Sequence, residues 1–280
     1  MDQVAIVGGG ELGGLLAHVL ARRDIASDIR LIDDNGRAAQ GKALDISQAA
    51  PVEGFASRLS GSAELSVAAG ASIVAIADPF GAPEWQGEPA MLLLKRLREF
   101  APRALIVCAG ASHCDLVERG VRELHLPRTR LFGSAPEALA GGVRALAAVE
   151  ASGTPSDVSL SVLGIPPHHI VIPWEEATVG GFALTRVLSE PARRRLEGRV
   201  AALWPPGPYA LAAAAAKVID TILRESRRLV TCFVAPDDSA GRRARAAALP
   251  VRLGPAGVIE VMLPELSARE RVRLDNAMLL

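Results

Sequence analysis

The stretch that decides the fold is residues 4–20, which read VAIVGGGELGGLLAHVL. Four apolar residues precede a run of glycines, and apolar residues then return at helical spacing, which is typical of a buried strand that turns into a helix. The glycines have the spacing Gly-x-Gly-x-x-Gly, in which missing side chains let a pyrophosphate approach the free N–H groups of the helix. The alternative is a glycine turn that only packs helix on strand. The predicted cofactor-binding residues of this turn are Gly8, Gly10, Glu11, Leu12 and Gly13.

A second signal for a dinucleotide follows the next apolar run, residues 29–32, which ends in Asp33 and Asp34. Asp33 follows Gly13 by 20 positions, where a carboxylate can accept both hydroxyls of an adenosine ribose. A 2′-phosphate would be repelled, because two carboxylates and no arginine stand at this point. We therefore predict NAD as the cofactor, with Asp33 as the ribose ligand.

Short apolar runs at residues 73–77 and 105–107 alternate with helical patterns, which predicts a parallel sheet. After about residue 140 the pattern changes to a helix at 141–151 and hairpin-like strands at 158–163 and 171–182. A helix from residue 209 to about 224, strands at 230–235 and 258–263 and a helix from 267 complete the chain. The predicted fold class is α/β. A parallel sheet is expected in the first half of the chain, and a second lobe begins after about residue 140.

Composition limits the partners and the compartment. The chain of 280 residues has 31 basic and 31 acidic side chains, so it lacks the charge surplus that drives nonspecific binding to nucleic acid or anionic membranes. Its three cysteines form no C-x-x-C pair, which predicts free thiols and a cytoplasmic location. No apolar run approaches the roughly 20 residues of a membrane span, and the acidic second residue argues against a signal peptide. We expect a small molecule or another protein as partner, with no nucleic acid and no membrane.

Residues 4–54 resemble the N-terminal half of the lactate/malate dehydrogenase family, the NAD-dependent 2-hydroxy-acid dehydrogenases. The most specific segment is QGKALD at residues 40–45, followed by PVEG at 51–54. Further similarity at residues 126–133, 157–164, 178–181 and 255–258 extends the resemblance over nearly the whole chain. The resemblance implies a Rossmann doubly wound parallel sheet in residues 1–138, an α+β substrate-type domain in residues 139–280, and NAD as cofactor. It also implies association through the Rossmann-domain helices, as a homodimer or as a heteromer with an intact homologue.

The catalytic residues that this resemblance implies are missing. The family uses a histidine base, an aspartate that orients it, arginines that grip the carboxylate and an asparagine beside the nicotinamide. On the matching motifs, the aspartate falls on Leu139, the substrate arginine on Gly142 and the asparagine on Ala111. The histidine falls on Pro166 or Pro167, neither of which can accept a proton.

The family's mobile, arginine-bearing loop is replaced by DPFGAPEWQGE at residues 78–88. No arginine or lysine occurs between Arg58 and Lys95, so this acidic, proline-containing loop is not suited to closing over a carboxylate substrate. Asp78 and Pro79 also place a carboxylate and a residue without N–H near the expected path of the cofactor. We therefore predict a crevice that excludes small dicarboxylates.

Two groups of side chains remain as candidates for other chemistry. His168 and His169 could supply a replacement base, with Glu175 or Glu176 as its orienting partner, although a solvated loop histidine is the other interpretation. A metal cluster that includes His113 and Cys114 is conceivable, but the spacing is not that of a ligand set, and we predict no metal site. The arginines at 193–195 and at 242–243 fit solvated faces.

Two functions follow. The leading one is an NAD(H)-binding, lactate/malate-dehydrogenase-like protein that has lost the 2-hydroxy-acid catalytic set and is a non-catalytic or accessory homologue. The alternative is an active NAD-dependent oxidoreductase on a different small hydroxy or oxo substrate that uses His168 or His169. Hydride transfer from NADH to a panel of 2-oxo compounds distinguishes them.

Overall fold

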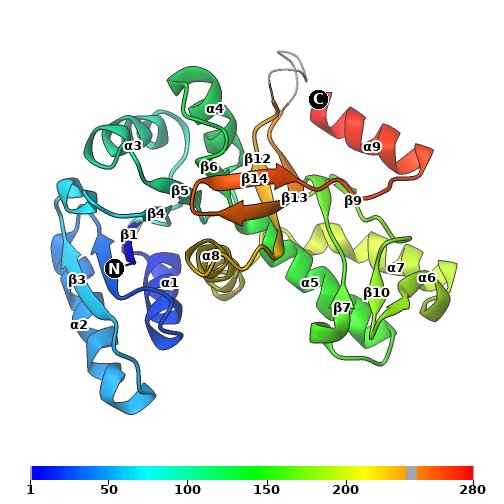
Figure 1. Cartoon of the computed structure of the whole chain (residues 1–280), viewed down its shortest axis with the longest axis horizontal. Coiled ribbons are helices and arrows are strands. Elements are labelled where there is room, and N and C mark those ends of the chain that lie inside the picture. Colours follow the sequence, from blue (N-terminus) through cyan, green and yellow to red (C-terminus); the bar gives the residue numbers. More distant parts are fainter. Residues whose placement is uncertain (1, 238–244, 280) are drawn as a thin grey trace.

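The computed structural model describes residues 2–237 and 245–279, so the arginines at 242–243 lie outside the described residues. Its main sheet begins with six parallel strands in the order β3-β2-β1-β4-β5-β6 (Figure 1). Their bounds are β1 (Gln3–Val7), β2 (Asp28–Ile32), β3 (Arg58–Ser62), β4 (Ile73–Ile76), β5 (Leu105–Cys108) and β6 (Leu131–Gly133). This is the strand order of the Rossmann fold, and it confirms the predicted fold class.

Helices cover both faces of the parallel sheet, which is why β1, β4 and β5 are apolar without alternation. Helices α3 and α4 lie on one side, and α1 and α8 lie side by side on the other (Figure 1). The helix bounds here are α1 (Glu11–Arg22), α2 (Gly36–Glu53), α3 (Gly87–Phe100), α4 (Cys114–Leu124) and α8 (Pro208–Leu223), with a 3-10 turn, η1 (Leu65–Ala68).

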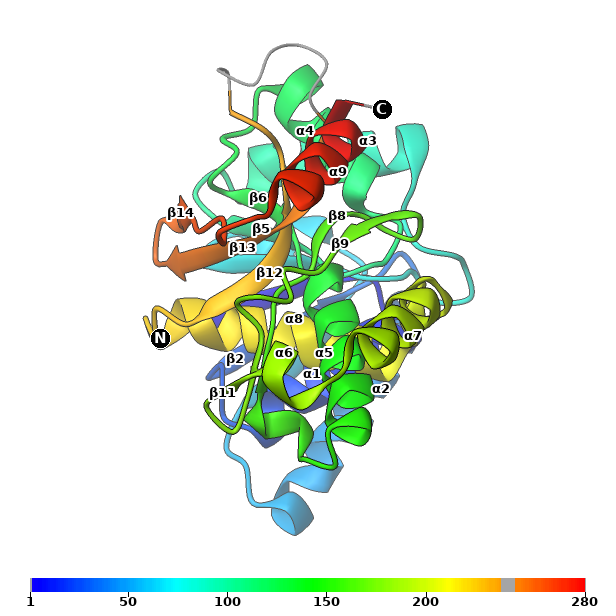
Figure 2. The same cartoon turned by 90° about the vertical axis from the view of Figure 1, so that its right-hand side faces the viewer.

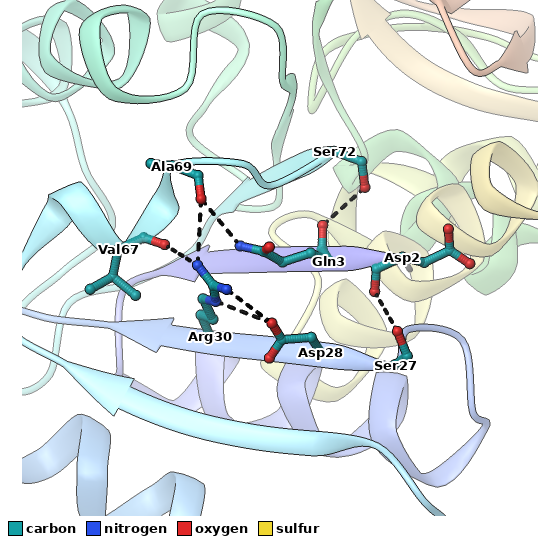
Figure 3. Close-up of polar contacts among 8 residues, drawn as sticks. All are labelled: Asp2, Gln3, Ser27, Asp28, Arg30, Val67, Ala69 and Ser72. Atoms are coloured by element: carbon teal, nitrogen blue, oxygen red, sulfur yellow. Dashed lines mark hydrogen bonds and ion pairs between the residues drawn. The ribbon is translucent and has the colours of Figure 1, made fainter.

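Polar side chains tie β1, β2 and η1 together away from the glycine turn (Figure 3). The guanidinium of Arg30 donates to Oδ2 of Asp28 at 3.1 and 3.2 Å and to the carbonyl oxygen of Val67 at 2.8 Å. The Ser72 hydroxyl donates to the carbonyl oxygen of Gln3 at 2.9 Å. These contacts fix the strands near their amino ends and leave the carboxyl edge, where a ligand of an open α/β sheet binds, to other residues.

In the second half, the sheet continues with antiparallel strands β12, β13, β8 and β9, and β14 pairs with β13. A small separate sheet has the order β11-β10-β7. The strand bounds are β7 (Val158–Ser159), β8 (Leu163–Ile165), β9 (His169–Val171), β10 (Thr178–Val179), β11 (Phe182–Ala183), β12 (Leu229–Val234), β13 (Ala247–Gly254) and β14 (Gly257–Val261). The helix bounds are α5 (Ala135–Glu150), α6 (Leu184–Val187), α7 (Glu190–Val200) and α9 (Ala268–Leu279), with 3-10 turns η2 (Pro155–Asp157) and η3 (Ala201–Leu203). Figure 2 shows α9 beside β8 and β9.

Several predicted boundaries in this half are wrong. The strands predicted at 158–163 and 171–182 are each divided between two sheets. Within the second of them, Pro173 lacks the N–H that a continuous ladder needs. Helix α5 begins at Ala135 rather than at 141, with Pro136 in its first turn, where the fixed φ of proline suits a helix.

Two apolar clusters form the core. The larger one contains the parallel strands and also α8, β12 and β13, whereas the smaller one packs around α5, α6 and α7. Helix α5 contributes Ala138 to the larger cluster and Leu139 to the smaller one. Because residues after 200 return to the larger cluster, the division into 1–138 and 139–280 stays a prediction.

The three cysteines are all among the described residues and all free, as predicted. Burial raises the pKa of each thiol, for Cys114 to about 12, so these side chains stay protonated and act as small apolar core residues. Within residues 2–237 and 245–279, no helix is long and apolar enough to cross a bilayer.

Candidate functional site

The glycine turn lies between β1 and α1, beside the point where strand order reverses from β1 to β4. Gly8 has φ +117°, and a Cβ there would lie 2.5 Å from the carbonyl oxygen of Asp78. A Cβ on Gly13 would collide with the carbonyl oxygen of Gly8. Glycine is therefore required at both positions. The structure brings the predicted residues Gly8, Gly10, Glu11, Leu12 and Gly13 together at the edge where a dinucleotide binds to this fold.

Asp33 lies directly after β2, as predicted, and its side chain is buried beside the turn. One oxygen, Oδ2, accepts from the N–H of Gly9 at 2.7 Å and from that of Phe80 at 2.8 Å. The other, Oδ1, accepts from the N–H of Asn35 at 2.8 Å. Asp33 thus lies at the end of β2, where the sequence placed it, and the segment after β4 contacts its carboxylate.

The N-terminus of α1 is occupied by a side chain of the protein. Oδ2 of Asp78 accepts from the N–H of Glu11 at 2.9 Å, and Oδ1 accepts from that of Gly13 at 3.0 Å. The carbonyl oxygen of Asp78 accepts from the N–H of Gly10 at 2.8 Å. A Cβ on Gly10 would collide with this carboxylate. As the side chains stand, the turn does not fit a pyrophosphate, because its donors and its space are taken.

A second carboxylate, that of Glu84, lies at the N-terminus of α4. It accepts from the N–H of Ala111 at 2.9 Å, from the N–H of Ser112 at 2.8 Å and from the Ser112 hydroxyl at 2.6 Å. Burial raises the pKa of Glu84, but the Ser112 hydrogen bonds, the nearby His113 ring and the Ala111 N–H outweigh it and hold the pKa below its ordinary value. Glu84 is therefore a charged anchor where the resemblance places the nicotinamide-side asparagine.

His113 is fully buried next to this anchor. Burial lowers its pKa to about 4, so the ring is neutral at pH 7, and Nδ1 accepts from the N–H of Gly110 at 3.0 Å. Cys114 instead donates to the carbonyl oxygen of Ala246 at 3.3 Å. No group of three His, Cys, Asp or Glu side chains suited to a metal ion occurs in the described part of the chain.

Little open space is left beside the ribose carboxylate. A cavity of about 160 Å³ is lined by Asp33, Asp34, Trp85 and Arg96, together with apolar residues of β1, β2 and α3. Small-molecule sites commonly have about 300–1,000 Å³. The segment 78–86 thus crosses the groove between α1 and α4, and only a small pocket remains at its adenosine side.

Apolar packing fills the positions where the resemblance places the substrate-binding groups. Leu139 is only 1% exposed and belongs to the smaller apolar cluster. A Cβ on Gly142 would lie 3.2 Å from Cδ1 of Leu203, so this leucine fills the space in front of the glycine. Pro166 and Pro167 form the turn between β8 and β9. None of these side chains can carry charge.

His168 and His169 are exposed and directly follow Pro166 and Pro167 where β8 turns into β9. They line a cavity of about 470 Å³ with Arg273, Asn276 and Leu279 of α9, and the lining of this cavity includes no residue of the glycine turn. The proposed orienting partners have other contacts. Glu175 lies 3.9 Å from Arg193, and Oε1 of Glu176 accepts from the N–H of Glu265 at 2.5 Å. The two histidines therefore line the same cavity, which is separate from the predicted cofactor-binding residues.

The packing at Gly142 can be tested by a pair of neighbouring substitutions. Gly142→Arg is expected to lower the free energy of unfolding by about 1–3 kcal/mol, because the new side chain must displace Leu203. Gly141→Arg is the control, since the nearest atom to a Cβ at that position is the tip of Arg144 at 3.9 Å. Urea denaturation measures both, and an equal loss in the two variants would contradict the filled position.

The sequence placed Asp78 near the cofactor path and Glu84 among the acidic residues of the crevice loop, but it did not predict their contacts with the N-termini of α1 and α4. The available signal was an acidic residue at the end of a parallel strand that neighbours a helix N-terminus, where negative charge is favoured. Sequence spacing alone does not show which of the two helix N-termini, α1 or α4, each carboxylate reaches.

Fold and turn together define a protein of the Rossmann class with an NAD-type crevice. Residues 2–96 match the family model of the lactate/malate dehydrogenase NAD-binding domain. The malate dehydrogenase of Thioalkalivibrio sulfidiphilus is 29% identical, covering 99% of this chain and 96% of its own length. That of Dehalococcoides mccartyi is 28% identical and covers 98% and 95%.

Solved structures agree in fold. Malate dehydrogenase from Salinibacter ruber has a TM-score of 0.87 at 23% identity and covers 98% of this chain and 93% of that one. Malate dehydrogenase from Plasmodium falciparum in complex with NADH has a TM-score of 0.89 at 18% identity, covering 99% and 95%. Over nearly its whole length the chain is thus similar to malate dehydrogenases, and its residues 2–96 match the NAD-binding domain of the lactate/malate dehydrogenase family.

Proposed function

We propose that this chain is an NAD(H)-binding member of the family that has lost the 2-hydroxy-acid catalytic set and acts as a non-catalytic or accessory homologue. The observation that carries the proposal is the packing of Leu203 in front of Gly142, beside the buried Leu139. A planar carboxylate is best held by a bidentate guanidinium, and an apolar contact offers it no hydrogen bond.

The charge of the crevice supports the same proposal. Asp78 and Glu84 face the groove, and Glu88 follows at the start of α3, where the resemblance implies an arginine-bearing loop. A dianionic acid that enters here meets like charge, which costs free energy at short range. The chain is therefore proposed to exclude the family's dicarboxylate substrates.

NAD is favoured over NADP at the adenosine end. Asp33 is buried at the end of β2, and Asp34 follows it beside the same small cavity. Two carboxylates suit ribose hydroxyls and repel a 2′-phosphate. We propose Gly8, Gly10, Glu11, Leu12, Gly13 and Asp33 as the cofactor-binding residues.

Calorimetry with NADH tests the cofactor part of the proposal. The wild-type chain is expected to bind with a dissociation constant on the order of 10 µM to 1 mM, and Gly10→Val is expected to abolish binding by filling the turn. Gly41→Val is the matched control, because nothing lies within 4 Å of a Cβ at Gly41. Equal NADH affinity in Gly10→Val and wild type would contradict this cofactor site.

The proposed partner is a second family chain, in a homodimer or in a heteromer with an intact homologue. Helices α1 and α2 and the start of α8 border an open groove of about 390 Å³. Its lining combines Leu15, Ile46, Ala49 and the exposed Tyr209 with the polar side chains of Glu11, His18, Lys42 and Asp45. Apolar and aromatic side chains of this kind are typical of interfaces. The three free thiols fit the proposed location in the reducing cytoplasm.

A further inference from the structure

Segment 78–86 is held across the cofactor groove at three points. The Asp78 carboxylate is bound at the N-terminus of α1, the Phe80 N–H donates to Asp33, and the Glu84 carboxylate is bound at the N-terminus of α4. Two of these contacts involve residues of the proposed cofactor site. The segment is thus joined to the groove by the groups that a dinucleotide would use.

The Asp78 contacts resemble those of a bound phosphate. Its two oxygens accept from separate N–H donors, those of Glu11 and Gly13, in the first turn of α1. The first N–H groups of a helix have no partner within the helix, and the helix dipole favours negative charge there. The carboxylate therefore satisfies the donors and the electrostatics that make a helix N-terminus bind an anion.

The two anions cannot be bound together. A Cβ on Gly10 would collide with Oδ2 and Cγ of Asp78, which shows that the space above this glycine is filled. A pyrophosphate needs that space, because the absent side chain at this position is what lets it approach the backbone. Even without overlap, the carboxylate would repel the phosphates at short range.

We propose that segment 78–86 is a built-in competitor for the pyrophosphate of the cofactor, and that a dinucleotide binds only after Asp78 has left the N-terminus of α1. This inference rests on the proposed function of NAD(H) binding. Release of Phe80 from Asp33 accompanies the opening, since Asp78 and Phe80 are two residues apart on one segment. The adenosine and pyrophosphate contacts therefore become available together.

The competitor lowers the apparent affinity by the fraction of molecules that are open. Hydrogen bonds to a charged group are stronger than neutral ones, so two of them from Asp78 keep the open fraction to roughly a tenth or less. Removal of the Asp78 carboxylate is expected to tighten NADH binding about tenfold or more.

The test compares Asp78→Gly with wild type by calorimetry using NADH, ADP and adenosine. NADH, ADP and adenosine are each expected to bind about tenfold more tightly to Asp78→Gly, because the adenosine and pyrophosphate contacts become available in the same open state. Glu88→Gln is the control for a general loss of negative charge. Glu88 is exposed and pairs with Arg119 of α4, at 2.6 Å.

Three outcomes overturn the proposal. Equal NADH affinity in wild type and Asp78→Gly would refute the competitor role of segment 78–86 but not the proposed NAD binding. If neither protein binds NADH or ADP, both the competitor role and the proposed NAD binding are refuted. An equal gain of NADH affinity in Glu88→Gln would show that the loss of one negative charge, and not the release of the turn, causes the tighter binding. If Asp78→Gly fails to fold, Asp78→Asn keeps the size of the side chain without its charge and is expected to bind NADH several-fold more tightly than wild type.

Hydrogen exchange gives a readout that does not need a ligand. The amides of Glu11 and Gly13 are expected to be protected in the free wild type, because Asp78 accepts from both. They are expected to exchange at least about tenfold faster in Asp78→Gly and to regain protection with ADP. Fast exchange of both amides in the free wild type would contradict the closed segment.

Discussion

Malate, lactate, oxaloacetate and pyruvate are expected to be turned over at least about 10⁴-fold more slowly than by an ordinary enzyme with kcat near 10 s⁻¹. Hydride leaves the carbinol carbon only as its hydroxyl proton is taken, and the positions that the resemblance assigns to base and clamp hold Pro166, Pro167 and Gly142. The measurement is NADH oxidation or NAD reduction with protein free of host dehydrogenase.

A double substitution, His168→Ala with His169→Ala, tells residual activity from contamination. Activity that survives unchanged in the double variant points to a contaminating enzyme. Activity that disappears supports the alternative oxidoreductase, with a base in the cavity beside α9. A turnover number of about 10 s⁻¹ with any of the four acids would refute the proposed loss of catalysis.

The N-terminal fold could be predicted because its local signals agree with its tertiary environment. Residues 4–7, 73–76 and 105–108 are apolar on both faces, and helices cover both faces of the strands they form. β3 was missed because RLSGS is an edge strand with polar side chains. Its Gly61 is needed where the strand approaches the backbone of α2 so closely that a Cβ would collide with Ala39. Such an approach is set by packing and not by periodicity.

The second half was predicted less well because its strands are short and are completed by distant segments. Leu163 and Gly164 pair with β9 and β13, whereas Val158 and Ser159, a few residues earlier, pair with β10. A sequence window reads both as one apolar strand. β13 was missed, although β14 follows it in a hairpin, and its other partners, β12 and β8, lie earlier in the chain.

The candidate site divides in the same way. The glycine spacing and Asp33 follow from local requirements, namely a positive φ at Gly8 and a carboxylate at the end of β2. Asp78 occupies the turn through contacts with Glu11 and Gly13, which lie 67 and 65 positions earlier in the chain. Glu84 is anchored by Ala111 and Ser112, which lie 27 and 28 positions later. Charge pattern indicated an acidic crevice, but only the packed structure shows which donors the carboxylates use.

A buried ion cluster away from the groove carries the largest expected effect on stability. Glu137 is 3% exposed, and its Oε1 accepts from Arg144 of α5 and Lys217 of α8, each at 2.6 Å. Its Oε2 accepts from the N–H of Thr231 in β12 at 2.8 Å. One carboxylate thus joins two helices and a strand at the place where the parallel sheet meets its antiparallel continuation.

Burial raises the pKa of Glu137, but Arg144, Lys217 and the hydrogen bonds outweigh it and hold the pKa below the ordinary value of 4.5. A group with a lowered folded-state pKa stabilises the fold above its unfolded pKa, and this stabilisation is lost as the pH falls through the folded value. The contribution of Glu137 is therefore fully present at pH 7 and declines below about pH 4.5.

Glu137→Ala is expected to lower the free energy of unfolding at pH 7 by about 3–5 kcal/mol, because it leaves two cations and a buried N–H without their acceptor. Glu150→Ala is the matched control in the same helix, since Glu150 makes one ion pair, at 3.4 Å with Arg195, and is expected to cost about 1 kcal/mol or less. Urea denaturation at pH 7 and pH 3.5 measures both. The difference between wild type and Glu137→Ala should narrow at the lower pH, and an equal effect of the two substitutions at pH 7 would show that the cluster does not stabilise the junction of α5, α8 and β12.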